Sequence, residues 1–270
     1  IAVWRGMLAR DLLRLDQMTP RVLLISLHGA AGTEAALADH GPALRAAMAD
    51  VLGLGQPDGP WHAARDGIAE LAGWLSLVTG ALGKIGIDLV QLGQSEIGEV
   101  AAGAGGGSST MPQKANPVSA EALVTLARLN AGDVAGMHHA MIHAQERDGT
   151  ALGLEWNILP AMLERTAAAL RIGAELAATL TPAADRIAAT FAADRGRMAA
   201  EAAGFILSQT MPRAEALRLV AKALGMVQTG AAPTLPDALS RLVPGRDWRT
   251  DLAPENLTGA APSQARQPEN

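Results

Sequence analysis

The feature of this sequence that most constrains its fold is a regular run of apolar residues between positions 68 and 92. The apolar side chains recur at alternating intervals of three and four residues: Ile68, Leu71, Leu75, Val78, Leu82, Ile85, Leu89 and Leu92. This spacing puts them on one face of an α-helix and is typical of a helix packed along its whole length against near-parallel neighbours. The sequence therefore predicts a long bundle helix here.

Two further segments predict long helices. Residues 159–180 repeat the spacing, with Pro160 near the expected start and Pro182 beyond the expected end. Residues 117–145 are helical in composition, with apolar residues at approximately helical spacing. Because alternating β-branched runs are few, long helices in series predict an all-α fold, a long-helix bundle. In a monomer, the apolar face of one such helix would remain exposed to water, so we expect the protein to form oligomers. A monomeric bundle of about three to five helices is the alternative.

The sequence favours two domains. We expect residues 1–180 to form a central long-helix bundle and residues 181–270 a smaller C-terminal helical domain. Shorter helices are expected between 183 and 228, with breaks near Gly204 and at Met211-Pro212. The tail from Leu252 to Asn270 is rich in proline, glycine and polar residues, so we expect it to be loosely ordered.

Composition narrows the classes of function. The net charge is -5 and no polybasic run occurs, so neither a nucleic-acid nor a membrane-surface partner is indicated. The 270 residues include no cysteine, which excludes disulfides, thiolate metal sites and cysteine nucleophiles and suits a reducing cytoplasm. No uninterrupted apolar run approaches the roughly 20 residues that span a bilayer. We expect a soluble, cytoplasmic protein with a small-molecule partner.

The helical pattern is interrupted by AAGAGGGSSTMPQKANPVSAEA, residues 101–122. The glycines leave room for backbone to approach a ligand, or for the segment to open and close. Asn116 followed by Pro117 fits an N-cap and first-turn position of the next helix, whose positive end favours anions. The structural alternative is a glycine-rich linker ahead of an ordinary capped helix.

Four polar side chains in this segment favour a carboxylate-bearing substrate. Lys114 supplies a cation, Asn116 a neutral donor, and Ser108 and Ser109 supply hydroxyls. The string SSTMPQKANP that contains them resembles the signature GSSxMPxKxNP of the fumarase, aspartase, argininosuccinate and adenylosuccinate lyase superfamily. HGAAGTEAALADHG (28–41) and LGKIGIDLVQLGQSEIGEV (82–100) resemble neighbouring segments of that superfamily.

Three segments are most similar to the 3-carboxy-cis,cis-muconate cycloisomerase branch of the superfamily. They are PWHAARD (60–66), GGSSTMPQKANPV (106–118) and QERDGTALGLEWNILP (145–160). The resemblance implies a homotetramer whose long helices join a central bundle, with active sites shared between subunits. It implies lactonisation of 3-carboxy-cis,cis-muconate, a polycarboxylate, through an aci-carboxylate intermediate, with no metal or other cofactor.

The resemblance also implies roles for individual residues. Ser108 matches the catalytic serine of a mobile loop, and whether it gives or takes the proton stays open. Lys114 and Asn116 match substrate-carboxylate ligands, with Ser109 beside them as a further substrate-binding residue. Glu121 is similar to a glutamate that holds a catalytic histidine, although a first-turn acid that interacts with the helix dipole is the structural alternative.

The sequence departs from the cycloisomerase pattern in several places. Leu152 and Gly153 stand where a tryptophan and a histidine are common, and His28 stands where a glycine is usual. The segment with the expected catalytic histidine precedes the position at which this sequence begins, so we expect a further N-terminal part of roughly 80 to 100 residues.

The chain's own histidines do not match a catalytic context. For His62 we expect capping or packing, for His40 a turn, and for His138, His139 and His143 a solvated helix face. Two other functions remain open: an adenylosuccinate- or argininosuccinate-type lyase that releases fumarate, and a catalytically inactive oligomeric scaffold.

Overall fold

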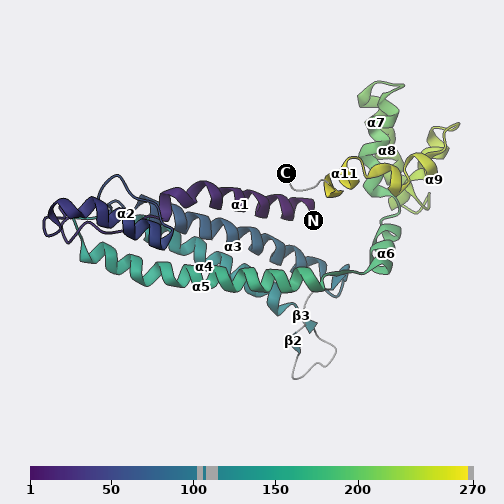
Figure 1. The fold of residues 1–270 in the computed structure, drawn as a ribbon. Helices are drawn as coiled ribbons and strands as arrows, with labels where there is room; N and C mark the ends of the chain where they lie inside the picture. The colour runs from purple at the N-terminus through teal and green to yellow at the C-terminus, as the bar shows by residue number, and fades with distance from the viewer. Residues whose placement is uncertain (102–105, 108–114, 267–270) are drawn as a thin grey trace. The chain divides into compact units, whose positions relative to one another are not determined.

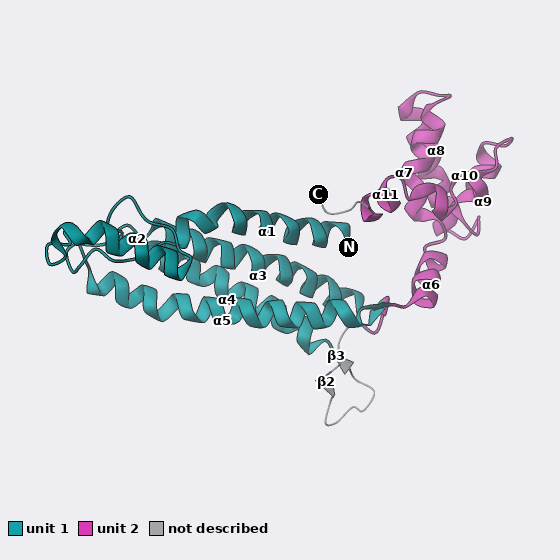
Figure 2. Ribbon diagram, in the orientation of Figure 1, with its two compact units in different colours: residues 1–94, 100–181 teal, residues 95–99, 182–270 magenta. Residues whose placement is uncertain are grey.

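A computed structural model describes residues 1–101, 106–107 and 115–266. The described part is mostly helical, so the all-α prediction is confirmed (Figure 1). The chain divides into two compact units (Figure 2). The first contains Ile1–Gln94 and Val100–Thr181, and the second contains Ser95–Glu99 and Pro182–Asn270.

Four long helices build the first unit. They are α1 (Ala2–Val22), α3 (Asp66–Leu92), α4 (Val118–His139) and α5 (Gly149–Thr179). They lie side by side, with α3 in contact with the other three (Figure 1). The short η1 (Ala38–His40) and α2 (Gly41–Leu52) lie between α1 and α3 in the chain. Because successive long helices reverse direction, residues 23–65 and 140–148 meet at one end of the bundle, which we call the loop end.

The apolar stripe of α3 forms the core of this unit, as predicted. Leu75, Val78, Leu82 and Leu89 are buried, and Leu123 of α4 and Met162 of α5 pack in the same two clusters. Burying one such side chain completely stabilises the folded state by about 1.5–3 kcal/mol. By length and apolar composition α3 could also cross a membrane. The core helix of a bundle has the same properties, because its apolar face is covered by other helices.

Two glycines of α3 let α4 approach closely. A Cβ added to Gly86 would lie 2.5 Å from the carbonyl oxygen of Ala120, and one added to Gly83 would lie 2.6 Å from the Cβ of Ala127. Both distances are too short for real atoms, so only glycine permits this helix spacing. The first turns of α4 are therefore held against α3 by backbone contact.

The predicted bounds of two helices were wrong. Helix α5 begins at Gly149 rather than near Leu159, and Pro160 lies inside it. Its true start is marked by Asp148, whose carboxylate accepts a hydrogen bond from the Thr150 N–H at 2.8 Å, as an N-cap residue does. Helix α4 ends at His139, before the predicted end near Gln145.

The second unit consists of short helices around Trp248, which is 1% exposed. Its elements are α6 (Ala184–Asp194), η2 (Arg197–Ala199), α7 (Ala200–Ser208), α8 (Arg213–Gln228), α9 (Leu235–Leu242), α10 (Trp248–Asp251), η3 (Pro254–Leu257) and α11 (Ala261–Arg266). The predicted break at Met211-Pro212 is confirmed. The break predicted near Gly204 was wrong, because Gly204 is buried inside α7. The tail contains the short helical segments η3 and α11.

Four very short strands complete the described elements. The strands β2 (Gly106–Gly107) and β3 (Ala115–Asn116) pair antiparallel, with Gly106 opposite Asn116 and Gly107 opposite Ala115. The strands β1 (Val100–Ala101) and β4 (Thr181–Pro182) form the other pair.

Candidate active site

In the sequence, the residues predicted to bind and transform a substrate fall between the end of α3 and the first turn of α4. Ser108, Ser109 and Lys114 lie outside the described residues. Asn116 and Glu121 are described, the first in β3 and the second in the first turn of α4. We call this end of the bundle, opposite the loop end, the hairpin end.

Asn116 is half-buried and belongs to the β2–β3 pair, opposite Gly106. This pairing brings residues 107 and 115 together just before α4 begins. The expected N-cap role of Asn116 was wrong: α4 begins at Val118, and its N-cap is Pro117, which makes no side-chain cap hydrogen bond. Asn116 lies in the strand pair instead.

Glu121 is exposed and is the acidic residue of the first turn of α4. Its carboxylate is therefore close to the positive end of the helix dipole, where a negative charge is favourable. Within the described residues, no imidazole contacts it. The chain's six histidines all lie at the loop end: His28, His40, His62, His138, His139 and His143. The 22 residues of α4 separate the two ends by about 30 Å.

At the loop end, a buried ion pair joins two segments that sequence analysis singled out. Arg65, in PWHAARD, donates from Nε to Glu155 Oε2 at 2.9 Å and from Nη2 to Oε1 at 2.5 Å. Glu155 belongs to the EW pair of QERDGTALGLEWNILP. The guanidinium carbon of Arg65 lies 4.8 Å from the ring centre of Trp61, whose indole N–H donates to the Ile25 carbonyl. Sequence analysis did not connect these two charges, although each lay in a segment of interest.

His28 is buried beside an acid. Its Nε2 lies 3.6 Å from Glu34 Oε1, and Arg45 also pairs with this carboxylate. The other nitrogen, Nδ1, is buried without a hydrogen-bond partner among the described residues. Glu34 and Ala38 have positive φ of 54° and 45°, a strained conformation for residues with a Cβ. His28, Glu34 and Arg45 therefore form a polar cluster, which the sequence did not predict.

His62 contacts the same loop through the backbone. Its Nε2 lies 2.8 Å from the carbonyl oxygen of Gly29. Because a carbonyl oxygen only accepts, this hydrogen bond requires a proton on Nε2. Helix α3 begins at Asp66, four positions after His62, so His62 does not cap it. Its contact ties residues 29 and 62 together.

The α4–α5 loop contains the remaining polar contacts at this end. His138 and His139 are exposed on α4, as expected, but His143 follows the helix, and its Nε2 is buried without a described partner. The solvated-face prediction was therefore wrong for His143. Hydrogen bonds from the backbone N–H groups of Ala144 and Thr150 hold the pKa of the Asp148 carboxyl below its usual range. No group of three or more potential metal ligands occurs among the described residues.

Comparisons with known proteins agree with the resemblance drawn from the motifs. A model of the Lyase family matches residues 1–136. The 3-carboxy-cis,cis-muconate cycloisomerase of Pseudomonas aeruginosa is 40% identical over 218 residues, which cover 80% of this chain and 48% of that protein. The nitrosuccinate lyase of Streptomyces davaonensis is 32% identical over 256 residues, which cover 89% of this chain and 54% of that protein.

Solved structures share the fold. The 3-carboxy-cis,cis-muconate lactonizing enzyme from Pseudomonas putida matches with a TM-score of 0.87 and 32% identity, over 97% of this chain and 60% of that one. The fumarate lyase from Mesorhizobium sp. BNC1 matches with a TM-score of 0.86 and 30% identity, over 97% of this chain and 60% of that one. The chain spans about half the length of the curated relatives that it matches.

Proposed function

Because the chain belongs to the Lyase family, we propose that it carries out the cycloisomerisation of 3-carboxy-cis,cis-muconate to 4-carboxymuconolactone, a step in aromatic-compound breakdown. The observation that carries the proposal is the start of α4. There the β2–β3 pair holds half-buried Asn116 beside the positive end of a long helix. The similarity to several cycloisomerases supports the same reaction.

The proposed chemistry is an intramolecular addition. A carboxylate oxygen of the substrate attacks its own double bond and closes the lactone ring, and a general acid protonates the neighbouring carbon. The reaction passes through an aci-carboxylate, so charge accumulates on a substrate carboxylate. Lys114, Asn116 and the end of α4 stabilise that charge, and Ser108 takes part in the proton transfer, with Ser109 beside it. Losing one such donor typically costs about 3–4 kcal/mol in the transition state.

The proposal includes a homotetramer with shared active sites. In one copy, Asn116 and Glu121 lie at the hairpin end, whereas PWHAARD (60–66) and residues 146–148 lie at the loop end. If both groups act on one substrate, they must come from different copies. The long helices also leave large apolar side chains exposed in this single chain, among them Leu12, Leu13, Leu77, Leu129, Leu163 and Leu170. Helices of other copies would cover them. A cytoplasmic location belongs to the proposal as well.

A lyase reaction is the second candidate, because 89% of this chain also matches a nitrosuccinate lyase at 32% identity. The two candidates share the carboxylate-binding start of α4. They differ in that the cycloisomerisation closes a ring and releases nothing, whereas the lyase reaction eliminates a group from the substrate and leaves fumarate. The test is to incubate the full-length protein with 3-carboxy-cis,cis-muconate and, separately, with nitrosuccinate and adenylosuccinate, and to follow ultraviolet absorbance. Loss of muconate absorbance with formation of the lactone supports the proposal. Fumarate release without lactone formation would contradict it.

A further inference from the structure

The second unit contains a cavity of about 640 Å³ that the proposed reaction does not use. This volume lies within the roughly 300–1,000 Å³ typical of small-molecule sites. Three parts of the unit frame it: the end of α6 with the turn into η2, the start of α9, and the segment from α10 to η3. The hollow is thus bordered by separate segments of the unit and is not a flat face of one helix.

The lining of the cavity is mainly apolar. Phe191, Met198 and Leu257 line it while remaining 49%, 58% and 39% exposed. They are three of the five large apolar side chains that are exposed among the described residues of this unit. Exposed apolar groups that gather around one hollow indicate a binding site more strongly than scattered ones do.

Hydrogen bonds hold two walls of the cavity in place. Arg195 has a left-handed backbone, and its Nε and Nη2 donate to the carbonyls of Pro233 and Ala232 at 2.7 and 2.9 Å. The backbone oxygen of Arg195 accepts from the N–H of Leu235 at 3.0 Å. The turn after α6 is therefore fastened to the start of α9, so this part of the cavity exists before any ligand binds.

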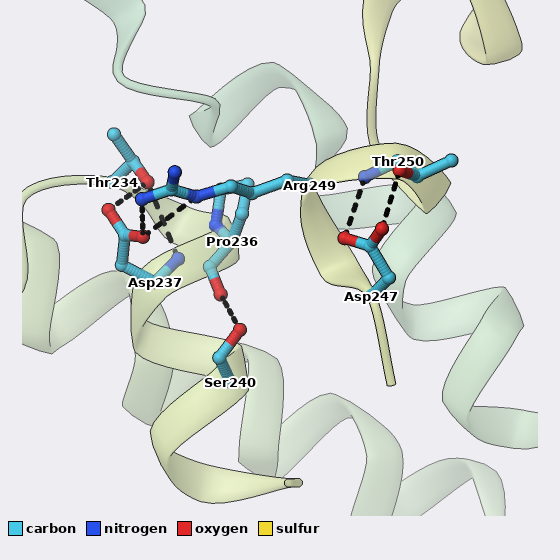
Figure 3. Close-up of polar contacts among 7 residues, drawn as sticks. All are labelled: Thr234, Pro236, Asp237, Ser240, Asp247, Arg249 and Thr250. Atoms are coloured by element: carbon cyan, nitrogen blue, oxygen red, sulfur yellow. Dashed lines mark hydrogen bonds and ion pairs between the residues drawn. The ribbon is translucent and has the colours of Figure 1, made fainter. Parts of the chain in front are cut away.

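The other polar wall is formed by Thr234, Asp237 and Arg249 (Figure 3). Thr234 caps α9 and donates from its hydroxyl to Asp237 Oδ2 at 2.7 Å. Arg249 donates from Nε and Nη2 to Asp237 Oδ1 at 3.3 and 2.8 Å. Both oxygens of Asp237 are thus occupied, whereas Nη1 of Arg249 makes no hydrogen bond to the residues that the structure describes. The Arg249 side chain is 79% exposed, so this edge is accessible.

Charge limits what the cavity can bind. Its charged lining residues are Asp194, Arg195, Asp237 and Arg249, whose charges sum to zero. Asp194 accepts from the Met198 N–H at 2.7 Å. Arg195 is half-buried, and its Nε and Nη2 are fixed on the carbonyls of Pro233 and Ala232. Because the Arg249 side chain is 79% exposed, its Nη1 edge is the more accessible cationic donor for a ligand. One guanidinium edge matches one carboxylate, and a neutral lining does not favour a polyanion.

We propose that this cavity binds a small aromatic monocarboxylate. The carboxylate accepts from Nη1 of Arg249, and the ring packs against Phe191, Met198 and Leu257. A flat ring with a single charge uses both the apolar hollow and the accessible cation of Arg249. The site is independent of the proposed cycloisomerisation.

The test uses the full chain and two fluorescent probes, 2-naphthoate and its neutral analogue 2-naphthamide. We expect saturable binding of 2-naphthoate. Arg249→Ala should weaken that binding at least tenfold and should change 2-naphthamide binding little. Arg246→Ala is the matched control: it removes an arginine of the same segment, one that pairs with Asp251 and does not line the cavity, so 2-naphthoate binding should be unchanged.

A second variant tests the hollow itself. Met198→Trp fills the cavity and should abolish binding of both probes, while circular dichroism and the thermal midpoint report whether the fold is retained. Three results would overturn the proposal: no saturable binding to the wild-type chain, equal losses in the two arginine variants, or undiminished binding in a folded Met198→Trp protein. Sedimentation is measured in parallel. A change of oligomeric mass in Met198→Trp would assign the hollow to a second copy and would also overturn the proposal.

Discussion

Arg65 and Glu155 form a two-pronged ion pair that leaves their side chains only 12% and 6% exposed. The pair connects the residue just before α3 with the second turn of α5, 90 positions later in the chain. Both charged groups have lost most of their contact with water, and only their mutual attraction offsets the free energy of that desolvation. The loop end of the bundle is therefore held by a contact that does not tolerate loss of one partner.

Glu155→Gln should destabilise the protein by about 3–5 kcal/mol, because it leaves the Arg65 charge buried without its partner. Urea denaturation followed by circular dichroism measures the loss. Glu70→Gln is the control, since it breaks the exposed pair with Arg21 and should change the midpoint only slightly. Similar midpoints for the two variants would show that the buried pair contributes no more than a surface pair.

Gly86→Ala should destabilise the bundle by about 1–3 kcal/mol, because the new methyl group has no room beside the Ala120 carbonyl. The same change at Gly80, also in α3, meets nothing within 4 Å. Gly80→Ala should be stabilising by up to about 1 kcal/mol through higher helix propensity. Thermal denaturation compares the midpoints of the two variants with that of the wild-type protein. Equal shifts of the midpoint would mean that the close approach of α3 and α4 at Gly86 does not hold α4 in place.

Ser108→Ala and Lys114→Ala should each reduce turnover of 3-carboxy-cis,cis-muconate by roughly two to three orders of magnitude with the fold intact. The reason is the loss of a group that acts on the charge developing in the proposed transition state. Lys222→Ala, at an exposed position of α8, removes the same charge and should leave turnover unchanged. The measurement is the initial rate of each variant of the full-length protein. A near-normal rate in Ser108→Ala or Lys114→Ala would contradict the proposed role of that residue.

The folded protein should become less stable in acid, partly because the Asp237 carboxylate becomes protonated. The hydrogen bond from Arg249, followed by that from Thr234, holds the pKa of Asp237 below its ordinary value of 3.8. A carboxyl whose pKa is depressed in the folded state stabilises the protein above its unfolded pKa, and this contribution disappears as the pH falls through the folded pKa. Asp237→Asn should therefore lower the thermal midpoint at pH 7 and flatten its decline below about pH 4. A decline as steep as that of the wild-type protein would exclude Asp237 as a contributor.

Much of the first unit could be predicted from local pattern. The spacing from Ile68 to Leu92 predicted the bounds of α3 to within a few residues, because helical periodicity is a property of neighbouring residues. The start of α5 was missed because the apolar spacing was followed from Leu159 and the N-cap signal at Asp148 was not used. Of the predicted site residues, Asn116 and Glu121 are described, and their roles stay predictions together with those of Ser108, Ser109 and Lys114.

The sequence by itself determined that this chain forms long helices whose apolar stripes must be covered, since a continuous seam of leucine and valine is unfavourable in water. Only the tertiary structure decided which distant side chains meet. The reversal of direction from α3 to α4 to α5 places every histidine at one end of the bundle and Glu121 at the other. It also brings Arg65 to Glu155, and separate packing in the second unit leaves an apolar hollow beside Arg249. Such contacts depend on the order and direction of packed helices, which no local spacing encodes.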